Sequence, residues 1–254
     1  MSKADKRERQ RENRDRAREE RARLMKRDKV KRSIIRLLVM ILIVGVAYGA
    51  FTFFTSSDDS ADNKAAGKCS STTPTTTAKN TEQQIPPMTI DPAKKYSATM
   101  VTSCGTIEIA LDAKAAPQSV NAFVALSREG FYDGTLFHRI VKDFVDQGGD
   151  PSGDGTGGPG FVLPDEPPTD GYKVGSVALA NSGPGTSGSQ FFIATSKTGA
   201  ETLDGGGPPF KYSILGQVTK GMDVVKLINS FGTVEQAGTP TKKIYTTKVT
   251  ITES

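Results

Sequence analysis

The pattern of hydrophobic and polar residues divides the 254-residue chain into parts of different character. A strongly polar start is followed by one long apolar run, by a second polar stretch, and then by many short apolar runs separated by glycine- and proline-containing turns. The last part has about 160 residues, which is enough to bury a core. We predict four parts: a charged tail over residues 1–32, a transmembrane helix over 33–55, a flexible linker over 56–94, and one folded domain over 95–254.

Short runs rich in β-branched and aromatic residues dominate the folded part and end at turn residues, which is typical of strands. They are Tyr96–Thr102, Thr106–Leu111, Leu136–Val141, Ser176–Asn181, Gln190–Thr195, Ser213–Val218 and Ile244–Ile251. Two segments, Pro117–Leu126 and Met222–Ile228, instead repeat apolar residues at helical spacing. Pro117 suits a first helical turn and Gly130 suits a stop. Many short strands with two helices predict a mainly β fold, an antiparallel barrel whose ends the helices cap.

The long apolar run, Ile34–Phe54, has 21 residues and one charge, Arg36. As a helix it would be roughly 31 Å long, close to the hydrocarbon thickness of a bilayer. The excess of Lys and Arg before it predicts a single-pass protein of the cell membrane, with a cytoplasmic N-terminus and an extracytoplasmic domain. The alternative is a signal peptide cleaved near Ala47-Tyr48-Gly49. A basic stretch of about thirty residues is too long for an ordinary signal, so we favour the lipid-embedded anchor.

Charge is concentrated in the tail. Residues 1–32 hold 15 Lys and Arg against 7 Asp and Glu, whereas the whole chain has a net charge of +5. The folded part is therefore not basic, and we expect it to bind no nucleic acid. We interpret the tail as a solvated charged segment, with an RNA-binding arm as the alternative. The linker, which includes the run Ser70–Thr77, shows no apolar period, and this favours a flexible tether.

The two cysteines, Cys69 and Cys104, both fall on the side expected to be exported. An oxidising compartment permits a disulfide between them that would fix the linker to the domain. Two free thiols are the alternative, because two residues give no spacing pattern to test. Lipid modification of Cys69 is disfavoured, since Gly67-Lys68 precedes it and the apolar run ends fifteen residues earlier.

The only histidine, His138, limits the chemistry that the chain can perform. A zinc site rich in histidine or a Ser-His-Asp triad would depend on this one residue. Strand alternation places His138 on the face of Leu136 and Ile140, and Arg139 on the opposite face. We interpret His138 as a core residue with satisfied ring nitrogens rather than as a catalytic group.

Polar residues embedded in the apolar strands form the remaining candidate site. Arg139 is costly to bury without partners, and Gln147 and Gln190 are candidate partners. From the pattern alone, a structural hydrogen-bond network and a functional site are equally supported. Residues 153–158 formally match the phosphate-binding pattern G-x-G-x-x-G, but Pro159 follows where a helix is required, and we exclude a phosphate site.

The chain resembles the cyclophilin family from about Tyr96 to Thr252, and four motifs within this stretch occur in the family's order and spacing. They are Phe137-His138-Arg139-Ile140, Phe144-Val145-Asp146-Gln147-Gly148-Gly149-Asp150, Ala180-Asn181-Ser182-Gly183-Pro184 and Gly188-Ser189-Gln190-Phe191-Phe192-Ile193. The resemblance implies a closed eight-stranded antiparallel barrel with two capping helices. It also implies a peptidyl-prolyl cis–trans isomerase that acts on X-Pro bonds of polypeptides without cofactor or metal. We expect a monomeric domain that assists the folding of exported proteins.

The resemblance also implies roles for individual residues. Arg139 is implied to be the catalytic residue, oriented by Gln190. The implied substrate contacts are a proline pocket walled by Phe144, Val145, Phe192 and Leu203, backbone contacts from Gln147 and Asn181, and a neighbouring subsite lined by Ala180. The chain departs from the family pattern at Val145 (often Met), Tyr212 (often His) and Thr202 (often Trp). The change at Thr202 predicts weak binding of cyclosporin-type drugs.

Two other functions stay open from the sequence. One is a proline-binding chaperone with little turnover, and the other is a scaffold whose tail recruits a cytoplasmic partner. The presence of Arg139, Phe144, Gln147 and Phe192 argues for turnover. Activity on an X-Pro peptide separates these functions from an isomerase.

Overall fold

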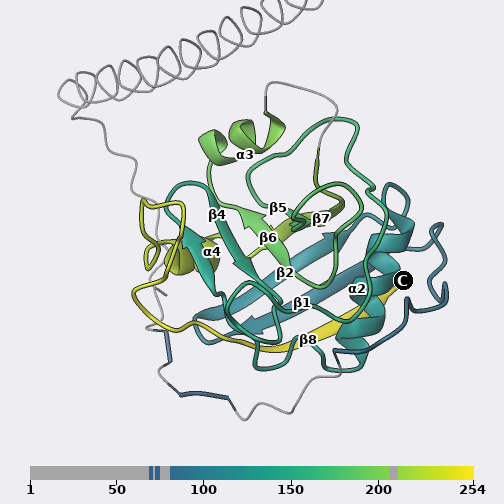
Figure 1. Ribbon diagram of the computed structural model, residues 1–254, viewed down its shortest axis with the longest axis horizontal. Helices are drawn as coiled ribbons and strands as arrows, with labels where there is room; N and C mark the ends of the chain where they lie inside the picture. The colour runs from purple at the N-terminus through teal and green to yellow at the C-terminus, as the bar shows by residue number, and fades with distance from the viewer. Residues whose placement is uncertain (1–68, 71, 75–80, 206–210) are drawn as a thin grey trace, which may run out of the picture. The chain divides into compact units, whose positions relative to one another are not determined.

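The computed structural model describes residues 69–70, 72–74, 81–205 and 211–254 (Figure 1). The predicted tail, the predicted transmembrane helix and much of the predicted linker lie outside these residues. Within the part that the structure describes, no helix is both long enough and apolar enough to cross a membrane.

The described residues contain eight strands in one antiparallel sheet, ordered β3-β4-β6-β5-β7-β2-β1-β8. The strands are β1 (Tyr96–Thr102), β2 (Gly105–Leu111), β3 (Arg139–Val141), β4 (Val145–Gly148), β5 (Ser176–Leu179), β6 (Phe191–Ala194), β7 (Ile214–Lys220) and β8 (Thr246–Glu253). The sheet curls so that its two ends meet: the Phe137 amide donates to the Ile244 carbonyl, and the Thr246 amide donates to the Thr135 carbonyl. The predicted mainly β, antiparallel architecture is confirmed.

Three helices occur in the same residues: α2 (Pro117–Arg128), α3 (Lys197–Asp204) and α4 (Met222–Asn229). The first and last match the two predicted helices, and Pro117 stands in the first turn of α2. The sequence did not predict α3, because of its eight residues only Gly199, Ala200 and Leu203 are buried. The Ser196 side chain caps this short helix by accepting the Gly199 amide at 2.9 Å.

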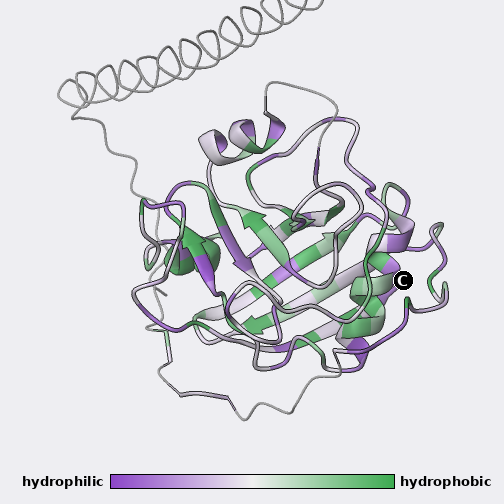
Figure 2. Ribbon diagram, in the orientation of Figure 1, coloured by the Kyte–Doolittle hydropathy of each residue, from purple (hydrophilic) through white to green (hydrophobic). Residues whose placement is uncertain are grey.

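Side-chain alternation on β6 separates two apolar clusters. Phe191 and Ile193 belong to the larger cluster, whereas Phe192 and Ala194 belong to the smaller one. In the larger cluster the Phe191 ring packs edge-on against three other aromatic rings, those of Phe123, Tyr132 and Phe137. Figure 2 shows the hydrophobic residues on the strands and on α2 and α4, where these clusters form.

The predicted strand Leu136–Val141 is shorter than expected, because only Arg139–Val141 pairs continuously. Leu136 makes isolated bridges instead. Ile140 packs in the larger cluster and Arg139 faces away from it, as predicted, but Phe137 is also fully buried in that cluster while Leu136 and His138 are half-buried, so regular alternation does not extend to the residues before Arg139. Both ring nitrogens of His138 are enclosed, and neither has a hydrogen-bond partner among the described residues. The expected satisfied core histidine is therefore not observed.

The last part of the predicted flexible linker lies against the domain. Ile90 is 5 % exposed and belongs to the larger apolar cluster. Farther back along the chain, Cys69 and Cys104 are joined by a disulfide, and the Ser70 amide donates to the Ser103 carbonyl at 2.7 Å. The folded body thus begins before residue 95, because apolar burial and backbone hydrogen bonds extend beyond the first strand.

Candidate active site

The register of the sheet brings the motif residues into one row. Arg139 on β3 lies opposite Gln147 on β4, which lies opposite Phe192 on β6, which lies opposite Ala178 on β5. Directly opposite residues of antiparallel strands have side chains on the same face. Segments separated by about forty residues therefore contribute to one surface.

The Arg139 guanidinium is held at all three of its nitrogen atoms. Nη1 donates to Gln147 Oε1 at 3.2 Å, Nε donates to the Gln236 carbonyl at 3.0 Å, and Nη2 donates to Gln236 Oε1 at 3.4 Å. Its Cζ lies 5.9 Å from the centroid of the Phe144 ring. Burial lowers the pKa of Arg139, but a guanidinium stays protonated in proteins. The result is a fixed, half-buried positive charge.

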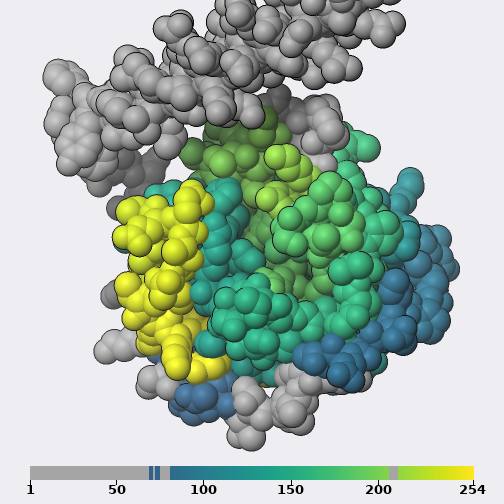
Figure 3. All heavy atoms as spheres, viewed as in Figure 1, coloured from purple at the N-terminus to yellow at the C-terminus, as the bar shows by residue number. Residues whose placement is uncertain are grey.

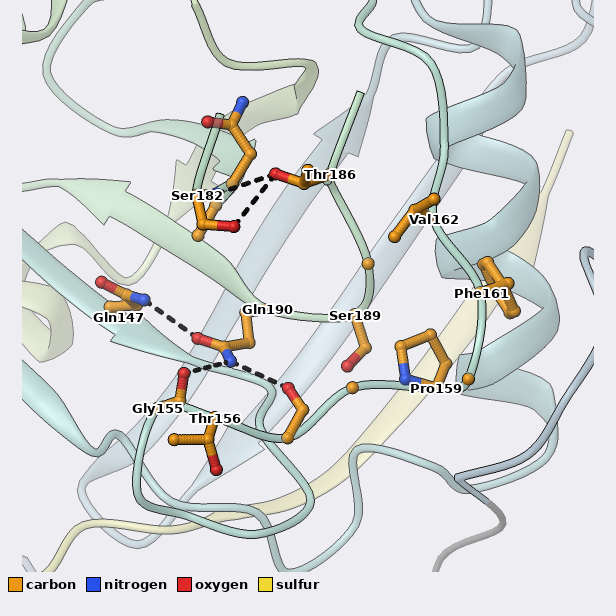
Figure 4. Close-up of a pocket in the computed structure, with 16 residues that line it drawn as sticks. Gln147, Gly155, Thr156, Pro159, Phe161, Val162, Ser182, Thr186, Ser189 and Gln190 are labelled. Carbon is orange, nitrogen blue, oxygen red and sulfur yellow. Dashed lines mark hydrogen bonds between the residues drawn. The ribbon is translucent and has the colours of Figure 1, made fainter. Parts of the chain in front are cut away.

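Two glutamines connect this charge to a loop. Gln147 Nε2 donates to Gln190 Oε1 at 3.0 Å, and Gln190 Nε2 donates to the carbonyls of Gly155 and Gly157 at 3.0 and 2.9 Å (Figure 4). Because the loop carbonyls accept from Gln190, its oxygen faces Gln147, and the Gln147 oxygen then faces Arg139. Among the described hydrogen bonds, Gln190 thus reaches Arg139 through Gln147 rather than by the direct contact that its expected role suggested.

An apolar cluster lies beside the guanidinium, because the Phe144 ring contacts Arg139, and we call it the site cluster. Its members belong to the smaller apolar cluster: Phe144, Val145, Phe192, Leu203 and Tyr212. Val145, Phe192 and Leu203 are buried, whereas Phe144 and Tyr212 are half-exposed. The Phe192 and Tyr212 rings meet edge-on with centroids 5.1 Å apart. All five residues were singled out from the sequence, and the structure brings them together.

Tyr172 packs in the site cluster and supports it through hydrogen bonds. The sequence did not predict this role. The Tyr172 hydroxyl accepts the Tyr212 amide at 2.8 Å and donates to the Tyr212 carbonyl at 2.7 Å. Thr202, the residue expected in place of tryptophan, is exposed on α3 one position before Leu203, and its hydroxyl donates to the Thr198 carbonyl at 2.7 Å. Thr202 therefore presents no aromatic surface next to the site cluster.

A cavity of about 600 Å³, which we call the groove, shares Gln147 and Gln190 with the Arg139 site. Ala180 and Asn181, which follow β5, line it. The Asn181 side chain donates to the Lys211 carbonyl at 2.8 Å, which fixes the loop after β5. Residues 155–162 line it as well, and Figure 4 shows Pro159, Phe161 and Val162 on the side away from Ser182. Among the described residues that line the groove, none carries a charge.

The glycine run that formally matched a phosphate loop forms part of this groove. Asp150 is fully buried, and its carboxylate accepts the amides of Ser152, Asp154 and Gly155. These bonds fold residues 152–157 into a compact loop whose carbonyls face Gln190. The sequence marks Asp150 only as the last residue of the Gly-Gly-Asp motif. Its role in holding the loop depends on the fold.

Gln236 is the other contact that the sequence missed. It lies in the segment after α4, which pairs with β3 through hydrogen bonds such as that from the Ile140 amide to the Gly238 carbonyl at 2.7 Å. In Figure 3 the C-terminal residues, in yellow, lie beside the teal residues that include β3. No motif marks this segment, since only the curl of the sheet brings it to Arg139.

Comparison with known proteins identifies the family. Residues 97–251 match the family model for cyclophilin type peptidyl-prolyl cis-trans isomerase. Peptidyl-prolyl cis-trans isomerase-like 1 of Mus musculus is 42 % identical over 156 residues, which cover 59 % of this chain and 86 % of the relative. Peptidyl-prolyl cis-trans isomerase CYP18-2 of Arabidopsis thaliana is 42 % identical over 140 residues, covering 53 % and 81 %.

Solved structures agree with this assignment. The crystal structure of a Cryptosporidium parvum cyclophilin type peptidyl-prolyl cis-trans isomerase superposes with a TM-score of 0.56 at 28 % identity, covering 63 % of this chain and 99 % of that one. A second structure of that protein, in the presence of the dipeptide Ala-Pro, gives a TM-score of 0.55. The chain therefore belongs to the cyclophilin family and is a peptidyl-prolyl cis–trans isomerase.

Proposed function

We propose that this isomerase acts on X-Pro bonds of exported polypeptides, assisting their folding, and that Arg139 stabilises the twisted amide. One observation carries the proposal: a guanidinium fixed at three nitrogen atoms lies next to an apolar cluster whose Phe144 ring it contacts. A proline ring that packs against this cluster would bring its nitrogen toward the charge.

The chemistry requires no nucleophile. An X-Pro bond resists rotation by about 18–20 kcal/mol because the nitrogen lone pair is delocalised into the carbonyl. Twisting the bond localises that lone pair on the proline nitrogen. A donor aimed at the nitrogen then binds the twisted state more tightly than the planar state, which lowers the barrier. Arg139 suits this role because it stays charged and does not exchange its proton.

The neighbouring side chains supply the substrate contacts. Gln147 uses one N–H and its oxygen within the network, and an amide side chain has a second N–H that suits a substrate carbonyl. The Asn181 side-chain oxygen suits a substrate N–H, since the Asn181 nitrogen donates to the Lys211 carbonyl. The groove accommodates residues on the amino-terminal side of the proline, with Ala180 lining the first subsite. Its uncharged lining favours small or neutral side chains.

We further propose that the domain works close to the outer surface of the cell membrane. The apolar run Ile34–Phe54 supports an anchor, and the Cys69–Cys104 disulfide supports an oxidising compartment. Cys69 follows the apolar run by fifteen residues, which span at most about 50 Å when fully extended. The disulfide thus gives the domain a shorter reach than a free 39-residue linker would.

An isomerisation assay on the full chain in detergent tests this function. The protein is expected to accelerate cis–trans exchange of an X-Pro peptide and the proline-limited refolding of a test polypeptide. A protein that binds the peptide without accelerating its exchange would instead be the proline-binding chaperone.

A further inference from the structure

Residues 81–90, which we call the strap, precede the part of the chain that matches the family model. They run along the domain without regular secondary structure and end at the buried Ile90. In Figure 3 the blue residues at this end of the described chain lie on the surface beside teal residues. The strap is therefore an addition to the family domain that is bound to it.

Asn121 on α2 holds one end of the strap. Its side chain is 3 % exposed, and its oxygen accepts the Thr89 amide at 2.9 Å and the Ile90 amide at 3.4 Å. Its nitrogen donates to the carbonyls of Pro86 and Pro87 at 3.3 and 3.0 Å. One buried amide thus uses both its oxygen and its nitrogen on the strap, so its loss would leave several backbone groups without partners.

The other end of the strap contacts the wall of the groove. The Gln83 amide donates to the Pro159 carbonyl at 2.9 Å. Next to it, Gly160 has a φ of +98°, and a Cβ placed there would lie 2.5 Å from the Thr81 carbonyl oxygen. The two backbones approach so closely that only glycine fits. Pro159 and Gly160, together with Phe161 and Val162, line the groove. Figure 4 shows Pro159, Phe161 and Val162 on the side away from Ser182.

We propose that the strap determines substrate specificity by fixing the Pro159–Val162 wall of the groove, with Asn121 as its positioning residue. This inference rests on the proposed function, in which the groove receives residues on the amino-terminal side of the proline. The catalytic site itself contains no strap residue. Releasing the strap should therefore alter which peptides are preferred, while isomerisation continues.

The test uses the full chain in detergent and peptides of the form Xaa-Ala-Pro-Phe, in which Xaa is Gly, Ala, Leu or Phe. Asn121→Ala removes the side chain that holds the strap, and Gln83→Pro removes the amide donated to Pro159. Ser127→Ala is the matched control, because Ser127 is also buried on α2 but donates to the Phe123 carbonyl within that helix. Hydrogen exchange at the Thr89 and Ile90 amides reports directly on release of the strap.

Both strap variants are expected to change the ratio of kcat/KM for Leu against Gly at Xaa by about tenfold, the lower end of the range for one methylene in a binding pocket. Ser127→Ala should lower the melting temperature and leave the ratio unchanged. If the Thr89 and Ile90 amides exchange rapidly, the strap has been released. Unchanged kcat/KM ratios in both strap variants would then overturn the proposal. Continued protection of the amides in Asn121→Ala would overturn the role of Asn121. Lack of turnover by the wild-type chain would contradict the proposed function instead.

Discussion

Asp146 lies between two site residues on β4 and makes the stability of the protein dependent on pH. Its side chain is fully buried, one oxygen accepts from Asn229 Nδ2 at 2.8 Å, and the other oxygen is enclosed without a partner among the described residues. Burial raises the pKa of Asp146 to about 8. The folded protein therefore keeps this carboxyl neutral at pH values where the unfolded chain has lost the proton.

The sign of the effect follows from proton binding. Between about pH 4 and pH 8 the folded state binds more protons at Asp146 than the unfolded state, so the free energy of unfolding decreases as pH rises. One pKa unit corresponds to about 1.4 kcal/mol, and a rise from 3.8 to about 8 gives an upper bound on the order of 6 kcal/mol. Most of the loss between pH 6 and 8 should come from this one group.

Urea unfolding at pH 6, 7, 8 and 9 measures this dependence in the wild type, in Asp146→Asn and in Asp143→Asn. The amide in Asp146→Asn cannot titrate, so its stability should stay nearly constant where that of the wild type decreases. Asp143→Asn is the matched control, because Asp143 is exposed on the same hairpin and asparagine tolerates its φ of 56°. Equal pH slopes in the wild type and in Asp146→Asn would refute the reasoning.

Three further predictions concern the disulfide, the drug site and the topology. Reduction of the Cys69–Cys104 disulfide, whose cysteines are 35 residues apart, should lower the free energy of unfolding by about 3–4 kcal/mol. If reductant lowers the free energy of unfolding of a double Cys→Ser variant as well, the effect does not come from the disulfide and the prediction is contradicted. Thr202→Trp should tighten cyclosporin binding, measured by calorimetry, because an indole adds contact area and an N–H donor beside Leu203; unchanged affinity would show that Thr202 is not the tryptophan position. Protease added outside intact spheroplasts should release the domain but leave an N-terminal tag uncut, and the reverse pattern would invert the topology.

Seven of the eight described strands and two of the three described helices could be predicted, because their apolar residues repeat at intervals of two or about 3.6. The sequence did not predict β4 and α3, for a common reason. In β4 the apolar Val145 is followed by Asp146, Gln147 and a glycine, and α3 buries one face of only eight residues. Such short elements are stabilised by tertiary contacts rather than by their own pattern.

Of the candidate site, only the residues within the motifs could be predicted from the sequence. Arg139, Gln147 and Gln190 come together because their strands are paired, as the resemblance implied. Gln236 and Asn121 could not be predicted, since their roles depend on which distant segment the fold places beside them. Both are polar residues in ordinary sequence contexts, and their hydrogen bonds reach segments 97 and more than 30 residues away.

The central claim is that Arg139 stabilises the twisted amide, and the initial rate of Arg139→Ala on an X-Pro peptide tests it most directly. We expect kcat/KM to decrease by about 10²–10³, or roughly 3–4 kcal/mol of transition-state stabilisation. Arg139→Lys should recover only part of the rate, because an ammonium lacks the planar fork of a guanidinium. Lys142→Ala, which removes an exposed charge at the end of the same strand, controls for general charge effects.

Circular dichroism should show that each variant is folded, because Arg139 is only half-buried and Gln147 can bind water in its absence. The account predicts a folded Arg139→Ala protein that is nearly inactive beside a fully active Lys142→Ala protein. A folded Arg139→Ala protein with a near wild-type rate would contradict it.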